Sequence, residues 1–242
     1  MHLIKLNAIP STNDFLKELI QSSIVENFTC VAAENQTQGR GQMGATWSVE
    51  QGKNLTFSIY IENVISDIAQ IYLLNVAVAV SIFKVLEEHK ISKLAIKWPN
   101  DIMAEGKKLG GILIENSIKG DGSITSIVGI GLNVNQSEFE NMPLATSMFN
   151  IITATFDKDL LLSNLTAQIE NTLMSMRNNS SELWATYKNN LFRKDLPTAF
   201  EVSDGKRIMG IIRDVTEQGL LVMEDDDENL NYYNLKEIKM LY

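Results

Sequence analysis

A glycine-rich segment, GRGQMG at residues 39–44, limits the fold of this chain most strongly. Its G-x-G-x-x-G spacing is that of the loop that binds a pyrophosphate in dinucleotide-binding folds. Such a loop opens a helix, but only ten residues separate Gly44 from Leu55, where the next apolar run begins. A three-turn crossover helix and its turn do not fit there. The sequence therefore disfavours a Rossmann-type nucleotide site.

The same segment has the composition of a ligand loop between two strands. Glycines let a backbone approach a ligand closely, and Arg40 can bind a phosphate or a carboxylate through two parallel hydrogen bonds. Trp47 offers a flat face to a purine. Taken alone, the loop is equally compatible with a mobile surface turn whose tryptophan is packed into the core.

Apolar periodicity predicts an α+β chain with a mixed central sheet and a small C-terminal β-barrel. Helices are expected at residues 11–19, 71–86 and 159–191, and strands at 29–34, 55–61, 94–98, 108–116 and 126–134. Four short apolar runs at 198–202, 207–215, 219–225 and 230–235 predict the barrel. We place the boundary near Phe192, which gives a catalytic domain at 1–191 and the barrel at 192–242.

Composition narrows the functional classes. The net charge of -9 argues against general binding to nucleic-acid backbones. The single Cys30 excludes a disulfide framework and a thiolate zinc site, and it favours a reducing compartment. The N-terminal sequence lacks the pattern of a secretion signal, and the apolar run 71–86 is shorter than the roughly 20 residues that span a bilayer. We expect a cytoplasmic protein that binds neither membranes nor nucleic acids.

Three further segments carry polar residues or glycines at strand ends: KWPND at 97–101, KLGGILIE at 108–115 and VGIGLNVN at 128–135. Pro99 ends its strand and turns the chain, so Asn100 and Asp101 are expected to be exposed. Glycine inside a strand marks a bulge or the close approach of a ligand or another backbone. Each segment alone is a weak signal.

Together, these segments resemble biotin protein ligases, the enzymes that attach biotin to carboxylases. The resemblance rests on the order and spacing of STND, QTQGRGQMGATW, KWPND, KLGGILIE and VGIGLNVN, and it covers residues 11–135 closely. It implies a class II synthetase-like catalytic domain with an SH3-like β-barrel. It also implies the monofunctional type, without the N-terminal DNA-binding domain of the members that act as repressors.

The resemblance implies a reaction in two steps. The carboxylate of biotin attacks the α-phosphate of ATP, with Mg²⁺ offsetting the charge, and this gives biotinyl-5′-AMP and pyrophosphate. The acyl group then passes to a lysine of a biotin carboxyl carrier protein, a domain of a biotin-dependent carboxylase. A homodimer is a possible assembly.

The resemblance also assigns site residues. The catalytic residues would be Arg40, Lys108 and Asp101, the last accepting a proton from the incoming lysine or orienting its amine. Biotin would contact Ser11, Thr12, Asn13, Gln36, Gly39, Arg40, Lys108 and Gly111. ATP and the adenylate would contact Arg40, Trp47, Asn100, Lys108 and Asn133, and no residue is assigned to a metal. Ser11 and Thr12 are equally suited to capping a helix, a role compatible with ligand contact.

One departure bears on activity. Many family members carry further arginines in the loop where this chain has Gln42 and Ala45. Lys53 or Lys107 could replace those positive charges, or magnesium could neutralise more of the charge on the phosphates. Alternatively, the adenylation step could be weaker. Two alternatives stay open: a lipoate-type ligase of the same fold, and a non-catalytic sensor that binds biotin or its adenylate.

Overall fold

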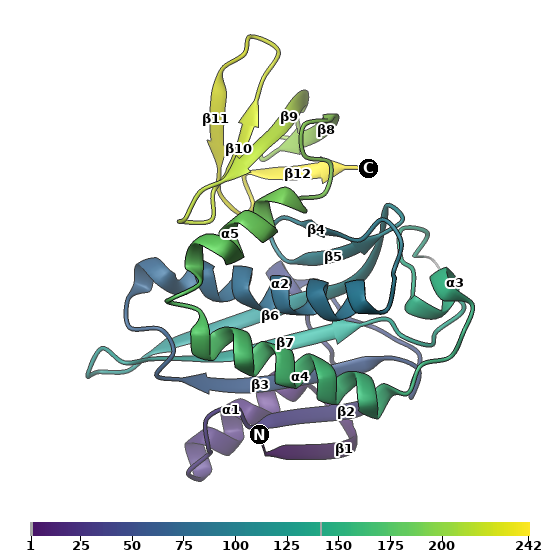
Figure 1. Cartoon of the computed structure of the whole chain (residues 1–242), viewed down its shortest axis with the longest axis vertical. Helices are drawn as coiled ribbons and strands as arrows, with labels where there is room; N and C mark the ends of the chain where they lie inside the picture. Colours follow the sequence, from purple (N-terminus) through teal and green to yellow (C-terminus); the bar gives the residue numbers. More distant parts are fainter. Residues whose placement is uncertain (1, 141) are drawn as a thin grey trace.

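The computed structural model describes residues 2–140 and 142–242, and its larger part is a seven-stranded mixed sheet (Figure 1). The strands are β1 (Leu3–Ile9), β2 (Cys30–Gln36), β3 (Leu55–Glu62), β4 (Ala95–Lys97), β5 (Asp101–Ala104), β6 (Lys107–Ile118) and β7 (Ile124–Leu132), in the spatial order β1-β2-β3-β7-β6-β5-β4. β1 and β2 are parallel, and the other neighbours are antiparallel. The expected mixed central sheet is confirmed.

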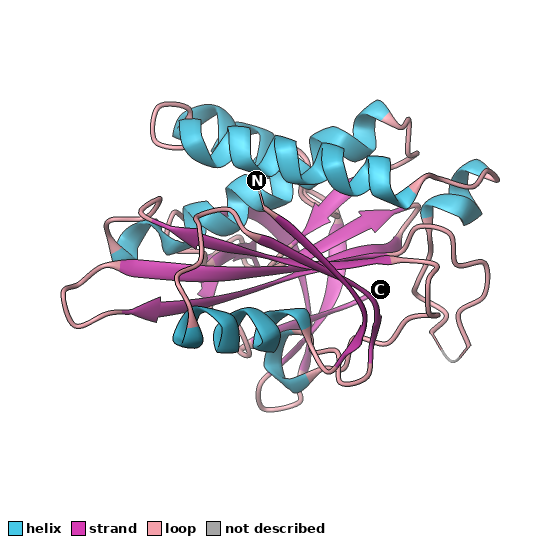
Figure 2. Cartoon of the chain, turned by 90° about the horizontal axis from the view of Figure 1, so that it is seen from below, coloured by secondary structure: helices cyan, strands magenta, loops and turns pink. Residues whose placement is uncertain are grey.

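Helices cover both faces of this sheet (Figure 2). One face carries α1 (Thr12–Ser22), which packs against β2, β3 and β7. The other carries α2 (Ile71–Glu88), with α4 (Lys158–Ser175) and α5 (Ser180–Asn189) packed against it. The short elements are α3 (Met148–Ile152) and two 3-10 helices, η1 (Gln42–Gly44) and η2 (Ile68–Gln70).

Strand β3 shows how the two faces differ. Its apolar residues Phe57 and Ile59 join the large core that includes α2. The alternate residues Ser58 and Tyr60 face α1, where Tyr60 packs with Leu16. Because side chains alternate along a strand, one face of the sheet is apolar while the other also carries polar groups.

Helix α2 is the centre of the large core. By length and composition, the helical stretch Ile68–Glu88 could cross a membrane. In the fold, most residues of α2 are buried against the sheet and against α4 and α5. This agrees with the buried helix expected from the sequence.

The chain from Pro197 onward forms a second, five-stranded antiparallel sheet, shown at the top of Figure 1. Its strands are β8 (Pro197–Val202), β9 (Arg207–Val215), β10 (Leu221–Glu224), β11 (Leu230–Tyr233) and β12 (Ile238–Leu241), in the order β11-β10-β9-β8-β12. The four predicted strands are present. β12 was not predicted, and it pairs with β8 at one edge.

The second sheet is joined to the first through one apolar core. Phe200 and Ile238 belong to the same buried cluster as Trp98 of the first part. The indole N–H of Trp98 donates to the carbonyl oxygen of Gly219 at 2.9 Å. Gly219 has a φ of +88°, and a Cβ there would lie 2.2 Å from the Tyr72 ring, so both conformation and space require glycine. The two sheets therefore form one continuous unit.

Two expectations were wrong in detail. The helical pattern at 159–191 forms two helices, α4 and α5, separated by a turn at residues 176–179. Asp101 was expected in an exposed turn, but it is 8% exposed and begins β5. The chain turns tightly after Pro99 and returns at once as a strand, with Asp101 opposite Lys97. Tertiary pairing therefore buries a carboxylate that the local sequence marks as a turn residue.

Cys30 gives a test of this packing. Its thiol is fully buried in β2, and burial raises its pKa to about 12, so the reactive thiolate is absent at neutral pH. We expect native protein at pH 8 to react with a thiol reagent such as DTNB far more slowly than protein in guanidinium chloride. Rapid native labelling would contradict the buried position of β2.

Candidate active site

A cavity of about 390 Å³ lies on the α1 side of the larger sheet. The structure brings ten of the predicted site residues to its wall: Ser11, Thr12, Asn13, Gln36, Arg40, Trp47, Asn100, Asp101, Lys108 and Gly111. They come from the start of α1, the glycine loop, the turn between β4 and β5, and strands β2, β5 and β6, so segments far apart in the sequence form one site.

Small residues aligned across neighbouring strands form the floor of the cavity. On β6, Gly111 lies opposite Asp101 of β5 and opposite Gly131 of β7. On β7, Gly131 in turn lies opposite Thr56 of β3. Large side chains in this row would fill the cavity, so the space depends on these residues being small.

The strand glycines also make room for side chains of the protein itself. A Cβ at Gly131 would lie 2.3 Å from the ring of Trp47, and a Cβ at Gly129 would lie 2.4 Å from Oδ1 of Asn13. The indole N–H of Trp47 is buried and has no hydrogen-bond partner among the described residues. At these two strand glycines, side chains of the protein make the close approach that was expected from a ligand or another backbone.

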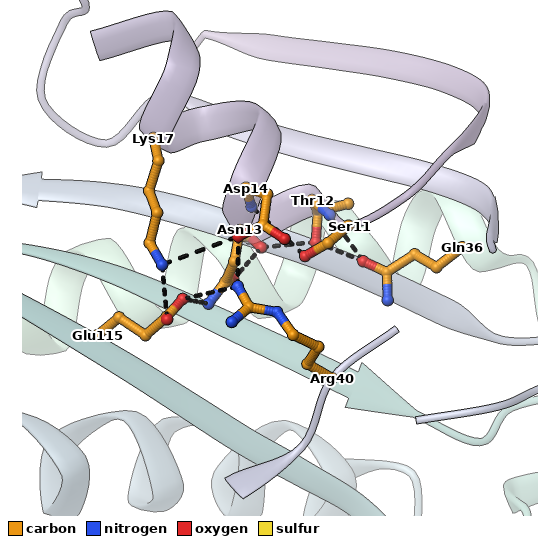
Figure 3. Close-up of polar contacts among 9 residues, drawn as sticks. Ser11, Thr12, Asn13, Asp14, Lys17, Gln36, Arg40 and Glu115 are labelled. Carbon is orange, nitrogen blue, oxygen red and sulfur yellow. Dashed lines mark hydrogen bonds and ion pairs between the residues drawn. The ribbon is translucent and has the colours of Figure 1, made fainter. Parts of the chain in front are cut away.

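Helix α1 begins at the cavity. Ser11 is its N-cap, and its hydroxyl accepts a hydrogen bond from the backbone N–H of Asp14. Oε1 of Gln36 accepts from the backbone N–H of Thr12 at 2.7 Å and from its hydroxyl at 3.0 Å (Figure 3). Ser11 thus both caps the helix and lines the cavity, and Thr12, the first residue of the helix, lines it as well.

A single carboxylate lies between two ammonium groups at the other end of the cavity. Oδ1 of Asp101 is 2.6 Å from Nζ of Lys108, and Oδ2 is 3.1 Å from Nζ of Lys97. Nζ of Lys108 also lies 5.7 Å from the ring centroid of Trp47. Two cations share one anion, so this end retains positive charge for an anionic ligand.

Arg40 is paired with carboxylates of the protein. Its Nη2 forms an ion pair with Asp14 and lies 3.6 Å from Oε2 of Glu115 (Figure 3). Burial acts to raise the pKa of Glu115, but hydrogen bonds from Lys17 and Asn13 outweigh it and hold the pKa below its ordinary value. The loop cation is therefore neutralised by ionised groups on α1 and β6.

Lys239 of β12 is a fourth cation at the cavity wall, beside Arg40, Lys97 and Lys108. Unlike those three, it forms no ion pair with any residue that the structure describes. Lys53 and Lys107, the expected substitutes for loop arginines, are exposed and do not line the cavity. No sequence motif marks Lys239, because only the docking of the second sheet brings it here.

Two predicted residues lie outside the cavity wall. Gly39 is buried, and a Cβ there would lie 2.3 Å from the carbonyl oxygen of Trp47. The amide of Asn133 donates to the carbonyl oxygen of Thr146 at 3.0 Å. Asn100 lines the cavity, and its side-chain amide donates a hydrogen bond to the carbonyl oxygen of Ile112 on β6 at 2.6 Å. Ligand contact by Gly39 and Asn133 stays a prediction.

Comparison with known proteins identifies the family of this chain. A profile of the Biotin/lipoate A/B protein ligase family matches residues 6–135, more than half of the chain. The chain belongs to this family.

Individual relatives extend the match. The Biotin--[acetyl-CoA-carboxylase] ligase of Mycobacterium tuberculosis is 28% identical over 218 residues, which cover 88% of this chain and 80% of that protein. The Bifunctional ligase/repressor BirA of Bacillus subtilis is 36% identical over 135 residues, 56% of this chain and 41% of that protein. In fold, the biotin protein ligase of Aquifex aeolicus, solved with biotin and ATP, matches with a TM-score of 0.82 at 24% identity over 99% of this chain and 98% of that one.

The packing of Trp47 against β7 can be tested by Gly131→Ala. The new methyl group would overlap the indole, so we expect the free energy of unfolding to fall by about 1–3 kcal/mol and the tryptophan emission to change. Gly120→Ala is the control, because a Cβ there meets nothing within 4 Å. Equal stability of the two variants would show that Trp47 does not pack on Gly131.

Proposed function

We propose that the protein is an ATP-dependent biotin ligase that forms biotinyl-5′-AMP and transfers biotin to a lysine of a carboxylase's biotin carboxyl carrier protein. The observation that carries this proposal is the cavity in which Lys108, Asp101, Arg40 and Trp47 face the polar start of α1. The proposal is supported by the family and by the name of the M. tuberculosis relative. We also propose that residues 1–191 carry the catalysis and that 192–242 form the second domain.

In the first step, a carboxylate oxygen of biotin bonds to the α-phosphorus of ATP and pyrophosphate leaves. Both reactants are anionic, so cations fixed in a closed site lower the barrier. We assign Lys108 to the oxygens of the carboxylate and the α-phosphate. Arg40 would hold the phosphate after leaving Asp14, which exchanges one anionic partner for another.

In the second step, the amine of the carrier lysine attacks the acyl carbon and AMP leaves. Asp101 is the carboxylate at the cavity floor, and we assign it to accept the proton of the amine or to orient it. Its two lysine neighbours would stabilise the charge on the departing phosphate.

The remaining contacts follow the shape of the cavity. Biotin's ureido ring needs hydrogen-bond partners when it is buried, and Thr12, Asn13 and Gln36 offer them. We assign the purine to the side of Trp47. Among the described residues no group of three or more His, Cys, Asp or Glu could hold a metal, so Mg²⁺ would be bound mainly by the phosphates of ATP.

The direct test is an assay with ATP, Mg²⁺, labelled biotin or lipoate, and a biotin carrier domain. We expect biotin-dependent release of pyrophosphate and transfer of label from biotin. Lys108→Ala should slow both steps by about a hundredfold or more. Pyrophosphate release without transfer would favour the sensor, transfer of lipoate would favour the lipoate-type ligase, and no reaction with biotin would exclude our proposal.

Lys239 supplies a second test. We propose that it binds the β- or γ-phosphate of ATP, because it is the cavity cation without an ion-pair partner among the described residues. Lys239→Ala should raise KM for ATP about tenfold, and Lys239→Arg should restore it.

Transfer from preformed biotinyl-5′-AMP should not change. Lys206→Ala, an exposed lysine in the β8–β9 turn, is the control. An unaltered KM for ATP in Lys239→Ala would show that the phosphates do not reach β12.

A further inference from the structure

Glu115 on β6 connects two residues of α1, Asn13 and Lys17, with Arg40 of the glycine loop. Its Oε2 accepts a hydrogen bond from Nδ2 of Asn13 at 2.7 Å, and its Oε1 is 2.6 Å from Nζ of Lys17 (Figure 3). The same Oε2 lies 3.6 Å from Nη2 of Arg40. Asn13 and Arg40 line the cavity, but Glu115 itself does not. Any effect of Glu115 on a ligand is therefore transmitted through other side chains.

The charge of Glu115 fixes the orientation of the Asn13 amide. An ionised carboxylate can only accept hydrogen bonds, so the NH₂ group of Asn13 must face it. The amide oxygen then points the other way, to within 2.6 Å of the Ser58 hydroxyl and over Gly129. Asn13 is 3% exposed and Ser58 is fully buried, so water does not compete for either contact.

The contacts continue from Ser58 to the wall of the cavity. The Ser58 hydroxyl is also 2.6 Å from the Thr12 hydroxyl, and Thr12 donates to Oε1 of Gln36. The oxygen of Gln36 is thereby occupied, which leaves its NH₂ group as a donor without a hydrogen-bond partner among the described residues. The backbone N–H of Thr12 thus orients Gln36, whereas the orientation of the neighbouring Asn13 amide depends on the carboxylate of Glu115.

We propose that Glu115 is a positioning residue that sets the hydrogen-bonding polarity of the α1 end of the cavity, and thereby its selectivity for a ring bearing an acceptor oxygen. The inference rests on the proposed function, because the cyclic urea of biotin is such a ring. A carboxylate at 115 keeps the NH₂ group of Asn13, which lines the cavity, turned toward it. A neutral amide at 115 lets Asn13 turn over and disturbs that pattern.

The experiment compares two ligands of nearly the same shape. 2-Iminobiotin carries nitrogen donors where biotin has its carbonyl oxygen. The ratio of the two affinities therefore reports whether the site presents hydrogen-bond donors or acceptors to this position. Calorimetry on the full chain, without ATP, would give Kd for both ligands in wild type, Glu115→Gln, Asn13→Ala and the double variant. We expect each single variant to weaken biotin about tenfold and to lower the preference for biotin over 2-iminobiotin by a similar factor.

The double variant tests whether Glu115 acts through Asn13. Two residues that act as a unit give a double variant close to either single one. Additive losses would instead mean that Glu115 acts through Arg40 or Lys17, and they would overturn the proposal. Should Glu115→Gln not fold, Asn13→Ala alone must still show the loss of preference.

The matched control is Glu34→Gln, which removes another glutamate that pairs with a lysine at 2.6 Å, Lys158, outside this cavity. It should leave both affinities unchanged. If Glu115→Gln weakens the binding of biotin and of 2-iminobiotin equally, or leaves both unchanged, Glu115 does not set the selectivity of the site and the inference is wrong. If wild type does not bind biotin at all, the proposed function fails as well.

Discussion

The structure depends on the alternation of side chains along β3, β6 and β7. One set of alternate residues is apolar and packs under α2, as Phe57 and Ile59 do. The other set faces α1 and includes small and polar residues, among which Ser58 and Gly129 leave space for the Asn13 amide. The same strands therefore provide both a dry core and a polar cavity, and the rigidity of the core fixes the positions of the polar groups.

Three of the four cations at the cavity are paired with carboxylates of the protein before any ligand binds. Arg40 is paired with Asp14, and the lysines at 97 and 108 share Asp101. An anionic substrate must therefore exchange with carboxylates of the protein, which reduces the net gain from each new ion pair. Lys239 differs, because it reaches the cavity from β12 without an ion-pair partner among the described residues. We infer that the second sheet contributes charge to the site as well as structural support.

Much of the fold was accessible from the sequence because its signals are local. The cap at Ser11, the apolar period of α2 and the turn residues between C-terminal strands each lie within a few neighbouring positions. The elements that were missed, such as β1, β5 and β12, are short or at sheet edges. Their existence depends on a partner strand, and pairing partners are not encoded by local periodicity.

By itself, the sequence predicted the mixed sheet from its local patterns, and it predicted ten of the residues around the cavity through the resemblance of its motifs to biotin protein ligases. Only the tertiary structure decided how these residues are paired. It buried Asp101 between two lysines, joined Glu115 to Asn13 and Arg40, and brought Lys239 to the cavity wall. Such pairings join residues on different elements, and their geometry follows from strand register and domain docking rather than from any local pattern of residues.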